Sequence, residues 1–293
     1  MSKVYNDSAY TAFTSERNFD LAKHSSIGCG GRAEIVFYPK SVAELTALLN
    51  KLQADGIAYR VIGNMTNLLP LDGGTQRALV HLKYLNGVFC NNGIFAYAGA
   101  TSGSFLRACK AANLSGGEFL YGIPCTMGGA LYMNAGAGGK YLAEIVESVL
   151  VYRKGESRLL TLAECEYAYK SSVFMRNGDV IIGASFRLKP SNGDEIARES
   201  ARYAQRRAHL PRGKSMGCVF KNPSGVFAGD LIERCGLKGY KIGGAVISEQ
   251  HANFIINDSG ATAKDVCALI EKIKDVVRKQ FGIDLQEEIE YLD

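Results

Sequence analysis

The sequence predicts an α+β protein, and three observations lead to this prediction. Apolar residues make up 47% of the 293-residue chain and charged residues 22%, which is an ordinary composition for a globular protein. Short apolar runs typical of strands alternate with turns rich in Gly and Asn. Amphipathic helices occur between these runs, without the regular strand–helix alternation of a doubly wound parallel sheet. The length suits one large domain or two smaller ones.

The N-terminal half combines two helical patterns with short strands. Ser41 and Glu44 form a capping-box pattern, after which apolar residues recur at helical spacing as far as Leu52. A second helix is predicted over residues 104–113, and a glycine-dense stretch follows over residues 116–139. The strands predicted in this half cover residues 34–38, 59–62, 78–82 and 94–98.

The C-terminal half continues the mixed pattern and ends in the most regular helix. Thr161 and Glu164 repeat the capping-box pattern. Residues 191–208 are polar and charged with helix-like spacing, and we interpret them as the boundary between two units. The last helix is predicted over residues 263–280, with its apolar residues on one face. The other predicted elements are strands at 147–153, 180–188, 243–247, 253–257 and around Val219, and a helix near 228–235.

Composition excludes several classes of protein. Gly accounts for 33 of 293 residues and Pro for only 6, which excludes collagen and Pro-rich disorder. The eight Cys are scattered without a C-x-x-C pair, so we expect reduced thiols rather than a disulfide framework. The four His show no metal-ligand spacing, and we expect no metal site. No run approaches the ~20 apolar residues needed to cross a bilayer. The net charge of +5 hints only weakly at an anionic ligand.

Two short motifs match nucleotide-binding patterns only formally. The G-x-G-x-x-A pattern at residues 28–33 precedes a predicted strand, whereas the dinucleotide fingerprint must follow a strand and open a helix. The Gly-Lys-Ser at residues 213–215 resembles the end of a P-loop, but Ala208 stands where that motif requires Gly. We interpret both matches as coincidences.

Two glycine-containing loops form a candidate ligand site. Residues 61–69 carry a strand into a tight turn with polar tips, and residues 122–130 with 133–137 form a second turn-forming stretch. Convergent backbone N–H groups in such loops suit a pyrophosphate, although two tight surface turns would give the same pattern. A third cluster at residues 217–223 places Cys218 between a glycine and polar neighbours, where it is either a reactive group or an inert thiol in a strand.

Eight motifs occur in an order that is characteristic of one enzyme family. The first three are Gly-Asn-Met-Thr-Asn-Leu-Leu, then Gly-Ile-Pro-Cys-Thr-Met-Gly-Gly-Ala with Met-Asn-Ala-Gly, then Tyr-Lys-Ser-Ser-Val-Phe. Gly-Cys-Val-Phe-Lys-Asn-Pro follows, and the last four motifs lie at 231–233, 236–245, 248–254 and 281–288. Over about residues 18–292 the chain resembles the UDP-N-acetylenolpyruvoylglucosamine reductases of peptidoglycan synthesis. It is similar to their shorter branch, which lacks an extra substrate-covering loop.

The resemblance implies a fold, a cofactor and a reaction. The fold is α+β, with an FAD-binding domain of the vanillyl-alcohol-oxidase type made of two subdomains, and a C-terminal substrate-binding domain. NADPH reduces FAD, which passes hydride to C3 of the enolpyruvyl group of UDP-N-acetyl-3-O-(1-carboxyvinyl)glucosamine, and a protein acid protonates C2 to give UDP-N-acetylmuramate. We expect a cytoplasmic monomer with no nucleic acid partner and no membrane insertion. The expected domains are an N-terminal extension at 1–17, the FAD-binding domain at 18–190 (subdomains about 18–85 and 86–190) and the substrate-binding domain at 191–293.

The resemblance also implies three catalytic residues. Hydride addition leaves negative charge that spreads into the substrate carboxylate, so a fixed cation or donor there lowers the barrier. Lys170 stands where the family has Arg, and it keeps the charge without the bidentate grip. Glu288 matches the family's Glu and would polarise the same group. Cys218 stands where the family has a Ser proton donor, and a thiol of pKa ~8.5 is a competent acid.

The flavin loops depart from the family at two positions. Met65 lies in a loop that usually reads Gly-Gly-Gly-Ser-Asn, and Met tolerates positive φ less well than Asn. Cys125 replaces a common Gly and adds bulk near the flavin. The implied cofactor contacts are Gly63, Asn64, Met65, Thr66, Asn67, Leu68, Gly99, Gly122, Ile123, Pro124, Thr126, Gly128, Gly129, Ala130, Asn134 and Gly136. The implied substrate contacts are Tyr169, Lys221, Asn222, Gln250 and His251.

Two other interpretations stay open. The departures at Lys170, Cys125 and Met65 are compatible with a paralogue that binds flavin or a UDP-sugar without turnover. A related flavoprotein oxidase acting on another substrate is the second alternative. The cluster at residues 217–223 and the C-terminal motifs favour the reductases over such an oxidase.

Overall fold

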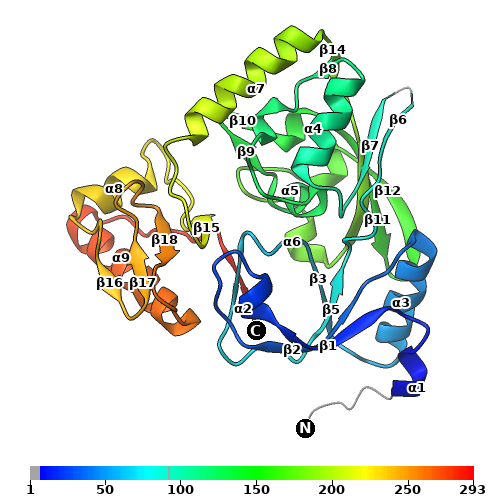
Figure 1. Cartoon of the computed structure of the whole chain (residues 1–293), viewed down its shortest axis with the longest axis horizontal. Helices are drawn as coiled ribbons and strands as arrows, with labels where there is room; N and C mark the ends of the chain where they lie inside the picture. The colour runs from blue at the N-terminus through cyan, green and yellow to red at the C-terminus, as the bar shows by residue number, and fades with distance from the viewer. Residues whose placement is uncertain (1–6, 92) are drawn as a thin grey trace. The chain divides into compact units, whose positions relative to one another are not determined.

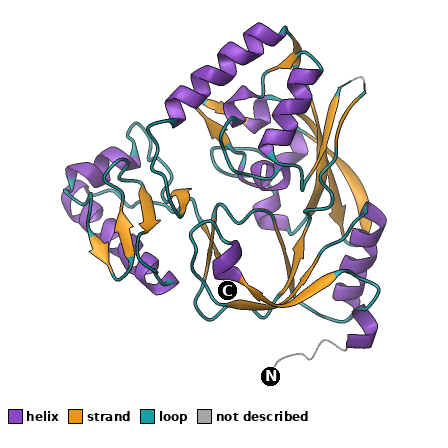
Figure 2. Ribbon diagram, in the orientation of Figure 1, coloured by secondary structure: helices purple, strands orange, loops and turns teal. Residues whose placement is uncertain are grey.

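The structure of the chain, a computed structural model, describes residues 7–91 and 93–293 and divides into two compact units (Figures 1 and 2). Unit 1 comprises the residues up to Glu16, Val36–Gly63 and Ala78–Ala208. Unit 2 comprises Arg17–Ile35, Asn64–Arg77 and His209–Asp293. Each unit is therefore assembled from segments that are far apart in the sequence.

The first part of unit 1 contains helix α3 (Val42–Ala54), which starts at the predicted position. Ser41 Oγ accepts a hydrogen bond from Glu44 N at 3.1 Å, but the Glu44 carboxylate accepts from Lys40 N, so only half of the capping box forms. The accompanying sheet has the order β1-β2-β5-β3, and β5 pairs in parallel with β2 and β3. Two of its strands, β3 (Tyr59–Ile62) and β5 (Ala78–His81), lie in unit 1, whereas β1 (Ser15–Asp20) and β2 (Arg32–Phe37) cross the division and contribute residues to both units.

The second part of unit 1 is built on a larger antiparallel sheet with the order β12-β11-β13-β7-β6. Helices α4 (Ser102–Ala111) and α5 (Met127–Met133) lie against this sheet (Figure 1). Each helix begins at a threonine cap, because Thr101 Oγ1 accepts from Ser104 N and Thr126 Oγ1 accepts from Gly129 N. The strands are β6 (Val88–Cys90), β7 (Ile94–Tyr97), β11 (Val146–Arg153), β12 (Glu156–Thr161) and β13 (Val180–Phe186).

One long helix and several short elements complete unit 1. Helix α7 (Gly193–Arg207) is the long polar helix that the sequence predicts. The other helices are α1 (Asp7–Tyr10), η1 (Glu118–Leu120), η2 (Leu142–Glu144), η3 (Ala163–Cys165) and α6 (Phe174–Asn177). Two short antiparallel pairs are β8 (Leu114–Ser115) with β14 (Lys189–Pro190), and β9 (Gly136–Ala137) with β10 (Lys140–Tyr141).

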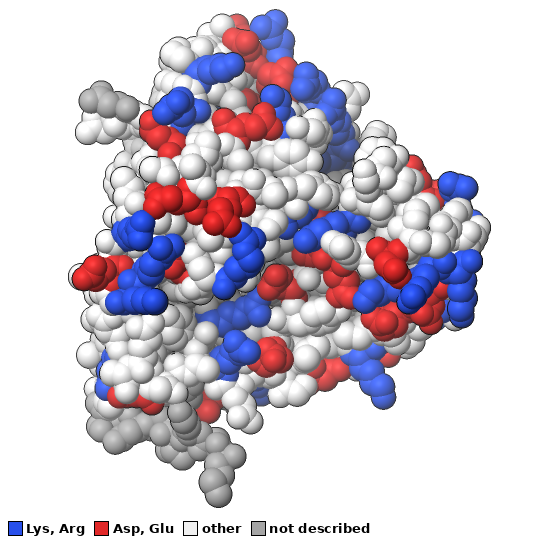
Figure 3. Space-filling view, turned by 180° about the vertical axis from the view of Figure 1, so that it is seen from behind, with Lys and Arg blue, Asp and Glu red and all other residues white. Residues whose placement is uncertain are grey.

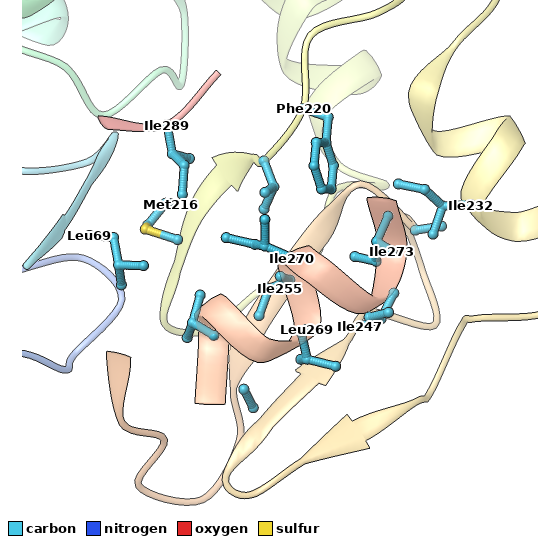
Figure 4. Packing of buried hydrophobic residues seen from close by; sticks show 14 of the residues in the cluster. Leu69, Met216, Phe220, Ile232, Ile247, Ile255, Leu269, Ile270, Ile273 and Ile289 are labelled. Atoms are coloured by element: carbon cyan, nitrogen blue, oxygen red, sulfur yellow. The ribbon is translucent and has the colours of Figure 1, made fainter. Parts of the chain in front are cut away.

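Unit 2 packs helices α8 (Ala228–Arg234) and α9 (Ala263–Phe281) with an antiparallel sheet of order β15-β18-β17-β16. The apolar face of α9 is buried as its periodicity predicts, and Leu269, Ile270 and Ile273 lie in the core of the unit (Figure 4). The remaining elements are α2 (Leu21–His24), β4 (Leu68–Pro70), β15 (Ser215–Cys218), β16 (Lys241–Ile242), β17 (Ala245–Ile247), β18 (Phe254–Asn257) and β19 (Glu290–Leu292).

Two N-terminal segments belong to unit 2, a feature that the sequence did not reveal. Ile27 and Leu69 are fully buried in the core of unit 2, and the Asn257 side chain donates to the Ile27 carbonyl at 2.9 Å. Strand β4 also pairs in parallel with β19. The units therefore follow a division different from the predicted domains, and α7 lies in unit 1 rather than in the C-terminal part. The first six residues of the predicted extension lie outside the described residues.

The second capping-box pattern is followed by a single helical turn only. Thr161 N donates to the Glu164 carboxylate, and Glu164 N donates to Thr161 Oγ1. The helix at this point is η3 alone, because no apolar face follows that a longer helix could bury. Across residues 7–91 and 93–293, no helix is both long and apolar enough to span a membrane. On the face shown in Figure 3, basic and acidic side chains are interspersed.

Candidate functional site

Gly63, near the start of the first predicted flavin loop, lies against the second loop within unit 1. A Cβ on Gly63 would overlap the Thr126 side chain, so glycine at the end of β3 is what permits the close approach to α5. Thr126 is the N-cap of α5 and belongs to the second loop. The two loops that the sequence singles out are therefore adjacent at Gly63 and Thr126.

The first loop offers consecutive backbone donors. Among the residues that the structure describes, the N–H groups of Asn64, Met65 and Thr66 donate to no protein acceptor. Successive N–H groups in a turn form a concavity that attracts an anion. The arrangement therefore fits the pyrophosphate of FAD, and it is the observation on which we judge that the chain can hold this cofactor.

Met65 takes the strained conformation of the first loop. Its φ is +49°, in the left-handed region that Gly or Asn occupies more easily. Its side chain is 3% exposed, and its carbonyl accepts a hydrogen bond from Ser26 Oγ at 3.2 Å. The loop thus keeps a residue that the sequence marked as unfavourable, and burial of the side chain compensates for the strain. No sequence signal pointed to Ser26.

The second loop uses most of its own donors inside the protein. Cys125 N donates to the Ile123 carbonyl, which also accepts from Ser102 Oγ, and Gly128 N donates to the Ala98 carbonyl. Burial raises the pKa of the Cys125 thiol to about 11, so its bulk is accommodated within the protein. The loop residues Gly122, Pro124 and Gly129 are exposed, and Ala130 is buried.

Three of the predicted cofactor glycines are explained by protein packing. A Cβ on Gly99 would overlap the Leu82 carbonyl, and one on Gly128 would lie 2.8 Å from the Ala98 Cβ. A Cβ on Gly136 would overlap the Lys140 carbonyl in the β9–β10 pair. Close approach of the chain to itself therefore requires glycine at these positions, independently of any ligand.

Lys170 lies in a tight turn of unit 1. Ala168 N donates to the Ser171 carbonyl at 3.1 Å, and Ser171 N donates to the Ala168 carbonyl at 3.2 Å. The φ of Lys170 is +50°, so the turn holds a second non-glycine residue in the left-handed region. Tyr169 is 42% exposed, and its ring lies edge-on to that of Tyr141. The sequence singled out Lys170 and Tyr169 but not their conformation.

Cys218 and Glu288 lie on adjacent extended segments of unit 2. Glu288 N donates to the Val219 carbonyl at 2.7 Å, and Phe220 forms an antiparallel bridge with Glu287. On its other side, Cys218 pairs with Phe254 of β18. Segments that are about 70 positions apart in sequence are thus neighbours through backbone pairing.

The first flavin loop continues into the same part of unit 2. The Asn67 side chain donates to the Glu288 carbonyl at 2.9 Å, and Glu290 N donates to the Asn67 carbonyl at 2.9 Å. Leu68 then starts β4, which pairs with β19 directly after Glu288. The loop that offers backbone donors is therefore tied to the segment that carries Glu288.

The predicted substrate residues of unit 2 lie near the Cys218 segment along the chain. Asn222 Oδ1 accepts from Ala228 N at 3.0 Å at the start of α8, so part of its amide has a structural role. His251 Nδ1 accepts from Asn253 N at 3.2 Å, and burial lowers the pKa of His251 below its ordinary value. Lys221 is half-buried and Gln250 is exposed.

A partly buried ion cluster lies beside Glu288, and no sequence signal pointed to it. The Glu287 carboxylate accepts from Lys274 Nζ at 2.7 Å and from the Tyr291 hydroxyl. Because the carboxylate is so close, the pKa of the Lys274 ammonium is raised. The family motif singles out Glu288 in the sequence, whereas the ion pair and hydrogen bond of Glu287 are visible only in the structure. Residues 7–91 and 93–293 contain no group of three or more His, Cys, Asp or Glu side chains that could hold a metal ion.

Comparisons with known proteins cover both units. Residues 33–162 match the profile described as FAD binding domain, and residues 208–292 match that of the UDP-N-acetylenolpyruvoylglucosamine reductase, C-terminal domain. The UDP-N-acetylenolpyruvoylglucosamine reductase of Geobacter metallireducens is 39% identical over 97% of this chain and 98% of its own length. That of Carboxydothermus hydrogenoformans is 38% identical over 94% of this chain and 93% of its own.

A solved structure gives the same result. The crystal structure of the UDP-N-acetylenolpyruvylglucosamine reductase from Thermus caldophilus matches with a TM-score of 0.84 and 33% identity, over 96% of this chain and all of the other. The predicted α+β fold, an FAD-binding domain followed by the C-terminal domain of these reductases, is thereby confirmed. The chain belongs to the UDP-N-acetylenolpyruvoylglucosamine reductase family.

Proposed function

We propose that the chain catalyses the NADPH-dependent reduction of UDP-N-acetyl-3-O-(1-carboxyvinyl)glucosamine to UDP-N-acetylmuramate through FAD, in peptidoglycan precursor synthesis. Family membership supports the reaction. The structural observation that carries the proposal is the arrangement of Asn67, Glu288 and the Cys218–Val219 segment in unit 2. It connects the donor-rich loop, the predicted acid and the predicted polarising carboxylate through backbone pairing.

The first loop is the part of the chain that we expect to hold FAD. The N–H groups of Asn64, Met65 and Thr66 would donate to its pyrophosphate. When bound, FAD would accept hydride from NADPH and supply it to C3 of the enolpyruvyl group.

Three side chains would complete the reaction. Lys170 and Glu288 would orient the substrate carboxylate and stabilise the charge that develops as C2 becomes electron-rich. Cys218 would then give its thiol proton to C2. A thiol loses a proton more easily than the hydroxyl that the family normally uses, so the substitution keeps a competent acid. Tyr169, Lys221, Asn222, Gln250 and His251 are the proposed contacts for the rest of the UDP-sugar.

The proposal extends to the compartment, the oligomeric state and the partners of the protein. The eight scattered Cys of the sequence favour a reducing compartment, and we propose a cytoplasmic protein. We also propose that it acts as a monomer, without a nucleic acid partner and without membrane insertion.

The experiment separates the proposal from its alternatives. Purified protein should be yellow or take up added FAD, and it should oxidise NADPH rapidly only when UDP-N-acetyl-3-O-(1-carboxyvinyl)glucosamine is present. A colourless protein that binds no FAD would contradict the proposal and both flavoprotein alternatives. Reaction of the reduced flavin with O2, unaffected by the sugar nucleotide, would favour an oxidase. Bound flavin without turnover would favour a non-catalytic paralogue.

A further inference from the structure

The turn that carries Lys170 has an unfavourable backbone that must be held by its surroundings. A non-glycine residue with φ of +50° costs free energy relative to an ordinary turn. The turn is short, and its two mutual backbone bonds join only Ala168 and Ser171. Contacts from outside the turn must therefore fix where it lies.

Asn134 supplies one of these contacts from the end of α5. It is 4% exposed and is itself left-handed, with φ of +45° at the C-cap of the helix. Its Nδ2 donates to the Ala168 carbonyl at 2.9 Å, and its Oδ1 accepts from Ala143 N at 3.0 Å. One buried amide thus joins the end of α5, the η2 segment and the first residue of the Lys170 turn.

Ser172 supplies the second contact, on the other side of Lys170. Its side chain is fully buried, and its Oγ donates to the Tyr132 carbonyl at 2.6 Å. Tyr132 also belongs to α5, so both ends of the turn are bound to the last turn of one helix. The two bonds bracket Lys170 by two residues on each side.

We infer that Asn134 is a positioning residue for Lys170, with Ser172 as its partner, rather than a contact to the flavin. The inference deepens the proposed function and rests on the role proposed there for Lys170. Both polar atoms of the Asn134 amide are already engaged by backbone groups, in a buried place where they need partners. Removing the donor to Ala168 should release the turn, and small misplacements of a positioning group slow a reaction by up to ~100-fold.

Asn134→Asp is the sharpest variant, because Asp keeps the size of the side chain, tolerance of φ above zero and an acceptor for Ala143 N. Its second oxygen would face the Ala168 carbonyl and repel it. We expect reoxidation of NADPH-reduced enzyme by the sugar nucleotide to slow about 10- to 100-fold. Reduction of bound flavin by NADPH and the Kd for FAD should change by less than about threefold. A flavin contact would instead weaken FAD binding and slow both half-reactions.

A double-mutant cycle with Lys170→Met separates positioning from general stability. If Asn134 acts through Lys170, Asn134→Asp should have almost no further effect in the Lys170→Met background, whereas independent effects would multiply. Two outcomes would overturn this inference but leave the proposed function standing. One is that the effects of Asn134→Asp and Lys170→Met on reoxidation multiply. The other is that Asn134→Asp is reoxidised normally while Lys170→Met is impaired. A Lys170→Met variant with normal reoxidation would overturn both the role of Lys170 and the inference.

Two further measurements cover the cases in which turnover cannot be followed or that variant does not fold. In FAD-free protein, exchange of the Ser171 amide should be at least about 10-fold faster in Asn134→Asp. The matched control is Asn257→Asp, which removes a buried amide with similar contacts in unit 2 and should leave Ser171 unchanged. If Asn134→Asp does not fold, Ser172→Ala should give the same split between half-reactions. Equal slowing of both half-reactions in Ser172→Ala would contradict the inference.

Discussion

The Lys170 turn of unit 1 and the Cys218–Glu288 segments of unit 2 are held in different ways. Lys170 lies in a strained turn that two buried side chains bind to the end of α5. Cys218 and Glu288 lie in extended segments joined by backbone bonds. Phe220 and Ile289, their neighbours in sequence, are buried in the core of unit 2 (Figure 4).

The difference indicates where each part of the site is vulnerable. Backbone pairing supported by an apolar core distributes the constraint over many bonds, so a single side-chain change hardly moves the neighbouring residues. A turn with positive φ depends on a few specific contacts, and the loss of one of them is enough to displace it. Substitutions in the Cys218–Glu288 segments should therefore change the reaction without displacing the backbone. Substitutions in the Lys170 turn should change the position of the turn and its backbone strain.

The largest effect should come from Cys218→Ala. The backbone pairing of Cys218 does not need its side chain, so the variant should fold normally and lose the proton donor alone. We expect reoxidation of reduced flavin by the sugar nucleotide to fall by about 10²–10⁴-fold, while NADPH reduces the flavin at an unchanged rate. Stopped-flow absorbance of the flavin follows both steps.

Two control variants make this result specific. Cys218→Ser should retain most of the rate because a hydroxyl can also donate the proton. Cys235→Ala, which changes a partly exposed thiol elsewhere in unit 2, should affect neither step. Equal loss of both half-reactions in Cys218→Ala would contradict a pure proton-donor role.

Local features of the molecule could be predicted from the sequence, whereas features that depend on distant contacts could not. Helices α3 and α9 were predicted nearly to the residue, because their apolar periodicity is a local signal. The assignment of Ile27 and Leu69 to unit 2 was missed, because it depends on contacts with residues far away in the chain. Family motifs singled out Lys170 and Cys218, but they carry no information on how each residue is held.

The interpretation of individual loop residues shows the same limit. Asn134 lies in a motif that the family resemblance assigns to the flavin, yet its amide contacts are to protein backbone. The family motif singles out Glu288, but the partners of its neighbour Glu287 become visible only when α9 is packed against the C-terminal segment. Side-chain partners are set by tertiary packing, which neither composition nor spacing encodes.

Met65 tests whether strain or burial dominates in the first loop. Met65→Gly relieves the left-handed backbone, worth about 1 kcal/mol, but removes a buried side chain, worth about 2–5 kcal/mol. We therefore expect a net loss of about 1–4 kcal/mol in the free energy of unfolding, measured by urea denaturation of FAD-free protein. Met65→Ala keeps the strain and should be the less stable of the two. A Gly variant more stable than the original chain would show that strain dominates.

At Lys170, unlike at Met65, relief of backbone strain should outweigh the loss of side-chain packing. The left-handed conformation disfavours a side chain at this position, whereas the proposed function needs the ammonium group. Lys170→Gly and Lys170→Ala both remove the ammonium and should be equally slow in reducing the enolpyruvyl group. Gly, however, accepts φ of +50° freely, so Lys170→Gly should be more stable than Lys170→Ala by about 0.5–1 kcal/mol. Thermal unfolding of FAD-free protein measures the difference. Equal stability of the two variants would indicate that the turn relaxes when the side chain is lost.

The smallest effect should be a pH dependence in the backbone-paired part of unit 2. His251 Nδ1 accepts from Asn253 N, and the Asn253 carbonyl accepts from Val219 N, next to Cys218. Burial lowers the pKa of His251 in the folded chain, so below about pH 6.5 the unfolded chain binds more protons. Stability contributed by the neutral imidazole is therefore complete above that pH and is lost as the pH falls toward the lower folded pKa.

His251→Gln isolates this contribution, because Gln does not titrate and is similar in length. As the pH falls from 7.5 to about 5, the original chain should lose free energy of unfolding relative to His251→Gln. Urea denaturation at several pH values measures this difference, and the slope should vanish above about pH 7. A constant difference across the range would mean that His251 titrates alike in the folded and unfolded chains. In that case the backbone-paired segment around Cys218 would be insensitive to pH as well as to single side chains.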